Sequence, residues 1–267
     1  MDNRPIGIFD SGLGGLTAVR ALRQMLPAED IVYFADSGRL PYGGRSRSQL
    51  RRMARQDLDL MASYGVKAIL VACGTLSSNA PDLLEENPIP SFGVLKASVD
   101  AMAQMPGTGA LGIIATEATI RSGAFEAALR EKCPGREIIA LPCPKLVPLI
   151  EFGHIDPSDP LLQAAMDDLA PLQGADALLL GCTHYGIVAE AIQKALGPST
   201  RLLEASACGA QAVRDFLTSR DLTGGQGREL YLTSGPAEDF QAAASLFLGR
   251  ERTILARHIP AMEAGDP

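Results

Sequence analysis

Two cysteines of this sequence, Cys73 and Cys182, occupy matching positions, and a thiol can donate a proton or, once ionised, accept one. Each ends a short aliphatic run and has a threonine close behind it. The runs are residues 68–72 and 177–181, and the threonines are Thr75 and Thr183. A single free cysteine is more often a small buried hydrophobe, but packing gives no reason for the threonines to recur. The repeated pattern predicts two thiols that act from opposite sides of one small molecule.

The other three cysteines favour ordinary packing roles. Cys133 and Cys143 adjoin prolines, and Cys208 lies in a segment rich in alanine and glycine. The sequence has no C-x-x-C pair and no cluster of cysteine and histidine at the spacing of zinc ligands, so we expect no metal site. The odd number of cysteines also argues against a framework of disulfide bonds.

The two cysteine runs belong to a regular alternation of predicted strands and helices. Short aliphatic runs that follow turn-prone residues are typical of buried strands in a parallel sheet. Strands are predicted at 6–9, 31–35, 68–72, 93–95, 110–115, 138–141, 177–181, 230–233 and 253–256. Helices are predicted at 16–26, 48–64, 122–132, 161–172, 207–217 and 239–248.

This alternation predicts an α/β fold with parallel sheets covered by helices. Open α/β sheets bind their ligands at the carboxyl ends of strands, so Cys73 and Cys182 are expected at such ends. Their strands are about a hundred residues apart, roughly the length of one domain. We therefore expect two α/β halves in a pseudo-twofold arrangement, facing each other across a central cleft that holds the active site.

A glycine-rich turn, residues 10–15, joins the first predicted strand to the first predicted helix. Backbone amides at the start of a helix can bind an anion. The glycine spacing differs from that of a dinucleotide-binding turn, and no acidic residue follows the second strand in the ribose-binding role, so a small carboxylate ligand is favoured. Asp10, at the end of the strand, is open to two interpretations: a helix cap or a proton-transfer partner of Cys73.

The composition is typical of a globular enzyme. The chain has 267 residues, of which 46% are hydrophobic and 21% charged, and its net charge is -7. This charge argues against a nucleic-acid surface, and the arginines within residues 45–52 are typical of a solvated helix face. No run approaches the length of a membrane span, and the N-terminus lacks the apolar core of a signal peptide. We therefore expect a cytoplasmic protein with reduced thiols and no membrane partner.

Four motifs stand out, at residues 9–16 (FDSGLGGL), 41–43 (PYG), 72–75 (ACGT) and 180–185 (LGCTHY). Together they resemble the glutamate racemases, within the aspartate/glutamate racemase superfamily. Weaker matches occur at residues 115–119, 148–151 and 232–235. The motifs keep the family's order and run nearly from end to end, so the resemblance is specific even though no single motif decides it.

The resemblance implies a racemase that needs no cofactor and interconverts L- and D-glutamate, supplying D-glutamate for peptidoglycan in the bacterial cell wall. One thiol would be the thiolate base and the other the thiol acid, with Cys73 acting on one enantiomer and Cys182 on the other. Asp10 would assist Cys73, while His184, together with Glu151, would assist at Cys182.

The same resemblance implies the substrate contacts and the assembly. The residues expected to bind the amino acid are Asp10, Ser11, Tyr42, Gly43, Gly74, Thr75, Thr183 and His184. Asp36 and Arg39 are expected to brace their loop rather than touch substrate. The family fold would give a discontinuous first domain, 1–97 plus 208–267, and a second domain, 98–207. The partners implied are glutamate and, in a homodimer, a second copy of the chain.

Three positions depart from the family pattern. Gly74 stands where an asparagine is usual, Lys96 lies where the family tends to have an acidic residue and Pro-Gly, and Gly186 replaces a common proline. These departures keep two alternatives open: a related racemase for another amino acid, and a non-catalytic relative that binds an acidic metabolite. The retention of both cysteines argues against the second alternative, because a binding protein needs no pair of proton-transfer groups.

Overall fold

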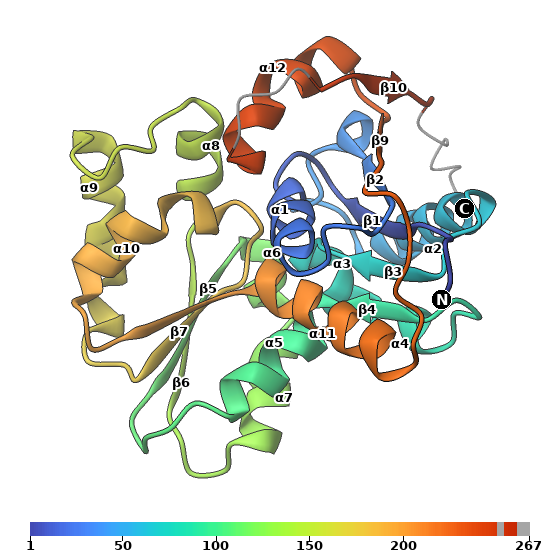
Figure 1. Cartoon of the computed structure of the whole chain (residues 1–267). Coiled ribbons are helices and arrows are strands. Elements are labelled where there is room, and N and C mark those ends of the chain that lie inside the picture. Colours follow the sequence, from blue (N-terminus) through green and yellow to red (C-terminus); the bar gives the residue numbers. More distant parts are fainter. Residues whose placement is uncertain (250–253, 261–267) are drawn as a thin grey trace.

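The computed structural model describes residues 1–249 and 254–260, which form two parallel β-sheets with helices packed around them (Figure 1). The six-stranded sheet has the order β10-β9-β2-β1-β3-β4, and the four-stranded sheet has the order β6-β5-β7-β8. In Figure 1 the smaller sheet lies on the left and the larger on the right. The predicted α/β fold with two parallel sheets is confirmed.

The strands of the larger sheet come from the two ends of the described chain. They are β1 (Ile6–Asp10), β2 (Ile31–Ala35), β3 (Ala68–Val71), β4 (Ser91–Gly93), β9 (Glu229–Thr233) and β10 (Ala256–His258). The strands of the smaller sheet are β5 (Leu111–Ala115), β6 (Ile138–Pro142), β7 (Ala177–Leu180) and β8 (Arg201–Glu204). Strands β1, β3, β5 and β7 are buried along their whole length, and apart from Asp10 at the end of β1 their residues are apolar, as is typical of parallel strands covered on both faces.

The helices connect these strands. They are α1 (Leu16–Met25), α2 (Arg47–Ser63), α3 (Gly74–Asn79), α4 (Pro81–Glu85), α5 (Val94–Ala103), α6 (Glu117–Arg121), α7 (Ala124–Lys132), α8 (Leu146–Glu151), α9 (Pro160–Met166), α10 (Ala189–Leu196), α11 (Ala205–Ser219) and α12 (Ala237–Leu248). Short 3-10 helices occur at η1 (Ser37–Arg39), η2 (Asp167–Leu172) and η3 (Tyr185–Val188).

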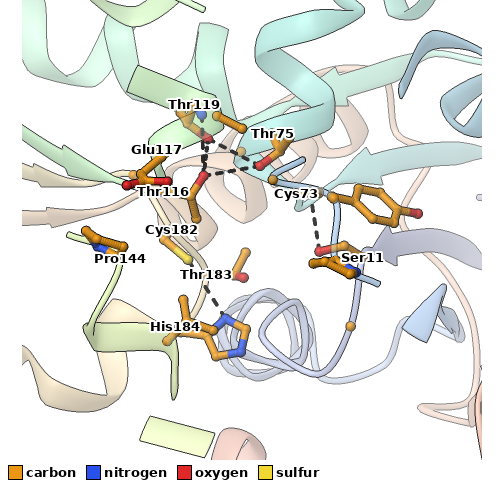
Figure 2. Close-up of a pocket in the computed structure, with 18 of the residues that line it drawn as sticks. Ser11, Cys73, Thr75, Thr116, Glu117, Thr119, Pro144, Cys182, Thr183 and His184 are labelled. Carbon is orange, nitrogen blue, oxygen red and sulfur yellow. Dashed lines mark hydrogen bonds between the residues drawn. The ribbon is translucent and has the colours of Figure 1, made fainter. Parts of the chain in front are cut away.

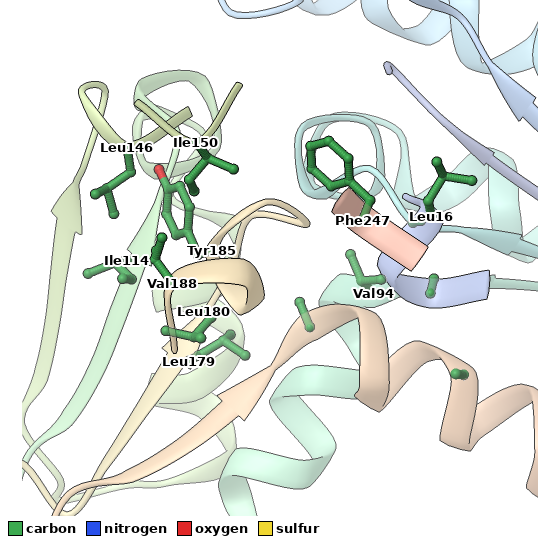
Figure 3. Packing of buried hydrophobic residues seen from close by; sticks show 14 of the residues in the cluster. Leu16, Val94, Ile114, Leu146, Ile150, Leu179, Leu180, Tyr185, Val188 and Phe247 are labelled. Carbon is green, nitrogen blue, oxygen red and sulfur yellow. The ribbon is translucent and has the colours of Figure 1, made fainter. Parts of the chain in front are cut away.

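One hydrophobic core spans both sheets. It runs from the smaller sheet, around Leu180 and Tyr185, to the helices against the larger sheet, at Leu16 and Val94 (Figure 3). Helix α11 packs against both α1 and α5 within this core. A second core lies on the other face of the larger sheet, beneath α2. The shared core fixes the two sheets relative to each other, because closely packed side chains transmit displacements rather than absorb them.

Several predicted element boundaries are wrong, each for a local reason. The strand predicted at 93–95 ends at Gly93, and α5 starts at Val94. The helix predicted at 122–132 starts at Ala124, because Gly123 before it is left-handed with φ 66°. The helix predicted at 161–172 becomes the 3-10 helix η2 after Met166, where Pro171 removes a backbone donor.

The last predicted strand, 253–256, is only partly testable. Thr253 lies outside the described residues, Ile254 and Leu255 are not in a strand, and β10 begins at Ala256. Strand β8 was not predicted, because this edge strand is only partly buried and reads Arg-Leu-Leu-Glu rather than as an apolar run.

Candidate active site

A cavity of about 360 Å³ lies where the carboxyl ends of the two sheets meet. Cys73 follows β3 and Cys182 follows β7, so both thiols reach it from strand ends, as the sequence predicted. Figure 2 shows Cys73 and Ser11 on one side of the cavity and Cys182 on the other. All the candidate residues line it: Asp10, Ser11, Tyr42, Gly43, Cys73, Gly74, Thr75, Glu151, Cys182, Thr183 and His184.

The surroundings of Cys73 favour a neutral thiol. Its Sγ lies 3.6 Å from the hydroxyl oxygen of Ser11, and its side chain is buried. Burial raises the pKa of Cys73 to about 12, and the negative charge of Asp10 adds to this rise. Cys73 therefore carries its proton at neutral pH in the unliganded protein.

Asp10 lies at the end of β1 and is almost fully buried. One carboxylate oxygen, Oδ2, accepts the backbone N–H groups of Gly12 at 3.3 Å and Gly15 at 2.8 Å, where α1 begins. The other, Oδ1, is buried and has no hydrogen-bond partner within the described part of the chain. Burial raises the pKa of this carboxyl, while the nearby charge of His184 acts in the opposite direction. A role as a cap of α1 therefore explains the contacts of Oδ2 but leaves Oδ1 unexplained.

Cys182 lies beside His184, which in turn contacts Glu151. Its Sγ lies 3.9 Å from Nδ1 of His184, whose Nε2 lies 3.1 Å from a carboxylate oxygen of Glu151 on α8. Burial alone would lower the pKa of His184, but the contacts with Cys182 and Glu151 outweigh burial and raise it to about 10. The ring of Phe247 on α12 makes a T-shaped contact with the imidazole, with ring centroids 5.1 Å apart. His184 is therefore a buried cation beside the Cys182 sulfur.

The loop that carries Tyr42 and Gly43 is anchored by hydrogen bonds to buried charged side chains. The Tyr42 hydroxyl donates a hydrogen bond to Asp36, so this hydroxyl is occupied within the protein. Asp36 also accepts hydrogen bonds from Arg39 and, at 2.8 Å, from Ser234, while Arg39 donates to Asp57 at 2.6 Å. These contacts agree with the bracing role expected for Asp36 and Arg39.

Three threonine hydroxyls form a polar wall that sequence reasoning had only partly identified. Thr75 lies 3.3 Å from both Thr116 and Thr119, and the latter two lie 2.9 Å apart (Figure 2). Thr75 follows a strand of the larger sheet, whereas the other two follow β5 of the smaller one. Thr116 and Thr119 belong to the weaker motif at residues 115–119. This motif begins where the predicted strand 110–115 ends, and each cysteine likewise lies at the end of a predicted strand. The wall joins the two halves through hydrogen bonds.

Cys143 also lines the cavity, although its sequence context favoured a packing role. It is buried within the shared core, and burial raises the pKa of its thiol to about 12. Its carbonyl oxygen accepts a hydrogen bond of 2.9 Å from the hydroxyl of Tyr185. Cys143 thus serves as a packed part of the cavity wall.

Two of the three departures from the family pattern lie away from the cavity. Lys96 is exposed on α5, pairs with Asp100 at 3.8 Å and does not line the cavity. Gly186 packs against the carboxylate of Glu204, so a side chain at this position would collide with it. The remaining departure, Gly74, lies in the cavity wall itself.

No group of three or more His, Cys, Asp or Glu side chains is placed to hold a metal ion in residues 1–249 and 254–260. None of the helices in those same ranges is both long and apolar enough to cross a membrane.

The family model described as Asp/Glu/Hydantoin racemase matches residues 14–213 of the chain. The glutamate racemase of Chlorobaculum tepidum is 39% identical over 255 residues, covering 92% of this chain and 93% of that relative. Two solved glutamate racemases have the same fold. The one from Francisella tularensis, in complex with D-glutamate, has a TM-score of 0.88 and 34% identity, with 98% and 99% of the two chains covered.

The second solved structure, from Thermus thermophilus in complex with β-chloro-D-alanine, has a TM-score of 0.86 and 38% identity, with 97% and 98% covered. These matches extend over nearly the whole chain, and the shared fold agrees with the two parallel sheets. The chain therefore belongs to the Asp/Glu/hydantoin racemase family and, within it, to the glutamate racemases.

Proposed function

We propose that this glutamate racemase interconverts L- and D-glutamate by a two-base mechanism in which Cys73 and Cys182 are the proton carriers. The observation that carries the proposal is the placement of two free thiols on opposite sides of one cavity, each from the end of a different parallel sheet. Inversion of an α-carbon requires loss of a proton from one face and gain of a proton on the other. Two thiols achieve this without any rotation of the carbanion.

The protons balance in each turnover. In one direction the Cys182 thiolate takes the α-proton, and the electron pair of the broken C–H bond is delocalised into the carboxylate. The Cys73 thiol then gives its proton to the opposite face of the α-carbon. The enzyme is left with a Cys182 thiol and a Cys73 thiolate, the state that performs the reverse reaction.

The charges around the two thiols support this assignment of the resting state. Cys73 is neutral because it is buried beside Asp10, so it starts as the acid. His184 lies beside Cys182 as a cation, which stabilises a thiolate there, so Cys182 starts as the base. His184 is in turn held by Glu151.

The polar groups of the cavity suit the charges of an acidic amino acid. The unpartnered oxygen of Asp10 is the group we assign to the substrate ammonium, because a buried carboxylate oxygen gains most from a cationic donor. We assign the hydroxyls of Ser11, Thr75 and Thr183 and the backbone of Gly43 to the two carboxylates. Such donors also stabilise the negative charge that develops on the α-carboxylate as the proton leaves. The Tyr42 hydroxyl, which donates to Asp36, contributes by holding its loop.

We extend the proposal to the wider setting of the enzyme. Its D-glutamate would serve peptidoglycan synthesis, and the reaction would take place in the cytoplasm, where the five free thiols stay reduced. Residues 1–97 with 208–267 would form one domain and residues 98–207 the other, a division supported by the two sheets. A homodimer is proposed from the family resemblance and is tested by light scattering of the purified protein.

The mechanism is tested by incubating the enzyme with L- or D-glutamate in D₂O. Circular dichroism of the amino acid follows inversion, and NMR follows deuterium at the α-carbon. We expect each enantiomer to be inverted with one solvent deuteron in the product. A panel of other L-amino acids is run in parallel, and a faster reaction with one of them would reassign the substrate. Inversion that retains the original α-proton would contradict the exchange of protons with two thiols.

A further inference from the structure

Gly74, the first residue of α3, is in direct contact with the other half of the site. A Cβ atom built on Gly74 would lie 2.5 Å from the backbone carbonyl oxygen of Gly181, which precedes Cys182. Real Cβ atoms essentially never come within 3.0 Å of a non-bonded heavy atom from another part of the chain. The obstacle is backbone, which cannot swing aside as the end of a long side chain can. Any side chain at position 74 therefore requires the two halves to separate.

The contact lies one residue from each thiol. Gly74 follows Cys73 and Gly181 precedes Cys182, so the two cysteine turns rest on each other through their backbones. A second glycine makes a related contact, since a Cβ on Gly14 would collide with the side chains of Thr183 and His184. By contrast, a Cβ on Gly44 would meet nothing within 4 Å. Gly74 and Gly14 are therefore tightly packed against the Cys182 turn, whereas Gly44 has free space around it.

We propose that Gly74 is a positioning residue that sets the separation of the two catalytic thiols. Its missing side chain lets the Cys182 turn settle against the Cys73 turn, and this backbone contact fixes how far apart the sulfurs lie. The inference rests on the proposed two-thiol mechanism and adds a residue that has no reacting atom of its own.

The consequence for catalysis is specific. Inversion needs both sulfurs within reach of the same α-carbon, whereas removal and return of a proton on one face needs only one. A displacement of about 1 Å at a reacting group can cost on the order of a hundredfold in rate. A side chain at position 74 should therefore slow inversion more than it slows exchange on a single face.

An asparagine, the residue usual in the family at this position, is predicted to harm this enzyme rather than repair it. Its Cβ would meet the same carbonyl oxygen as that of alanine, and its amide needs additional room. The hydrogen bonds of Thr75 with Thr116 and Thr119 cross the same junction beside Gly74. Separation of the two halves by an asparagine would also strain these bonds.

The experiment compares Gly74→Ala and Gly74→Asn with the matched control Gly44→Ala. Inversion and α-deuterium exchange are measured in the same D₂O sample, from each enantiomer of glutamate. We expect inversion to fall roughly ten- to hundredfold in both Gly74 variants. The ratio of exchange to inversion should rise several-fold for at least one enantiomer. The control should match the wild type in both quantities.

The ratio is independent of how much of a variant is folded, because unfolded protein contributes to neither rate. Circular dichroism melting curves of the variants provide the separate check on folding. An unchanged ratio in both Gly74 variants, or inversion at the wild-type rate, would overturn the role of Gly74 and leave the two-thiol mechanism intact. Wild-type enzyme that fails to exchange or invert glutamate would overturn the proposed function, and the role of Gly74 with it.

Discussion

The Cys73 and Cys182 halves of the site share a backbone plan but differ in charge. Each thiol follows a buried parallel strand and precedes a threonine that lines the cavity. Cys73 is buried beside the carboxylate of Asp10, whereas Cys182 is partly exposed and lies beside the cation of His184. Topology therefore places the two sulfurs symmetrically, and their nearest charged neighbours have opposite signs.

This difference teaches that a repeated motif fixes where a group lies but not what state it is in. The pKa of Cys73 rises because of burial and Asp10, and the pKa of His184 rises because Cys182 and Glu151 offset its burial. In the proposed mechanism this difference lets Cys182 start as the base and Cys73 as the acid.

The largest expected effect comes from removing one thiol at a time. Cys73→Ser and Cys182→Ser should each lower the rate of inversion by at least about a thousandfold, since each removes a general acid or base. The remaining thiol should still exchange the α-proton of one enantiomer, and the two variants should prefer opposite enantiomers. NMR of glutamate in D₂O measures this exchange. Cys208→Ser, which lies outside the cavity, is the control, and a shared preference in the two variants would contradict opposed faces.

The second comparison concerns the two carboxylates. Asp10→Asn should lower kcat by about a hundredfold, because Asp10 is 1% exposed and little solvent screens the charge that it loses. Glu151→Gln should cost less than about tenfold, since the Glu151 side chain is 44% exposed and its interaction with His184 is screened. Steady-state racemisation rates test the order, with Asp168→Asn on the surface as control. A larger loss for Glu151→Gln than for Asp10→Asn would contradict the expectation that the Cys73 half depends more on its carboxylate than the Cys182 half does.

The third comparison uses pH to isolate the Cys182 half. Because the pKa of His184 is raised to about 10, its imidazolium persists at neutral pH and is lost as pH rises through about 10. The groups that face it are Cys182, Glu151 and Asp10. We expect kcat/KM to fall on the alkaline side near pH 10. In His184→Gln this limb should disappear and the plateau should drop by about tenfold. A limb that survives in the variant would assign it to another group.

The smallest expected effect comes from Lys96, which lies outside both halves of the site. Lys96→Ala should change kcat and KM by less than about twofold, because Lys96 is exposed, pairs with Asp100 and does not line the cavity. Racemisation assays with glutamate and with the amino-acid panel check both rate and substrate choice. A changed substrate preference would show that the surface of α5 influences the site.

Much of this arrangement was predictable because buried parallel strands have a strong sequence signal. Strands β3 and β7 are apolar throughout and β1 is apolar up to Asp10, and the rule that ligands bind at strand carboxyl ends located both cysteines and Asp10. The family resemblance supplied Glu151, whose helix reaches His184 from a distant part of the chain.

Other features depend on how the two halves pack, which no local pattern records. The contact of Gly74 with Gly181 joins residues from different sheets, and the cation at His184 results from burial combined with two partners. The edge strand β8 lacks an apolar run, because one of its sides is not covered by a neighbouring strand.

The unequal charges around the two thiols also have a thermodynamic consequence. L- and D-glutamate have the same free energy in solution, so the equilibrium constant of the proposed reaction is one. The quotient kcat/KM must then be the same in the two directions, however different the neighbours of Cys73 and Cys182 are. The asymmetry can act only on kcat and KM separately. It decides which enantiomer remains longer on the enzyme, but it cannot enrich either one in the cell.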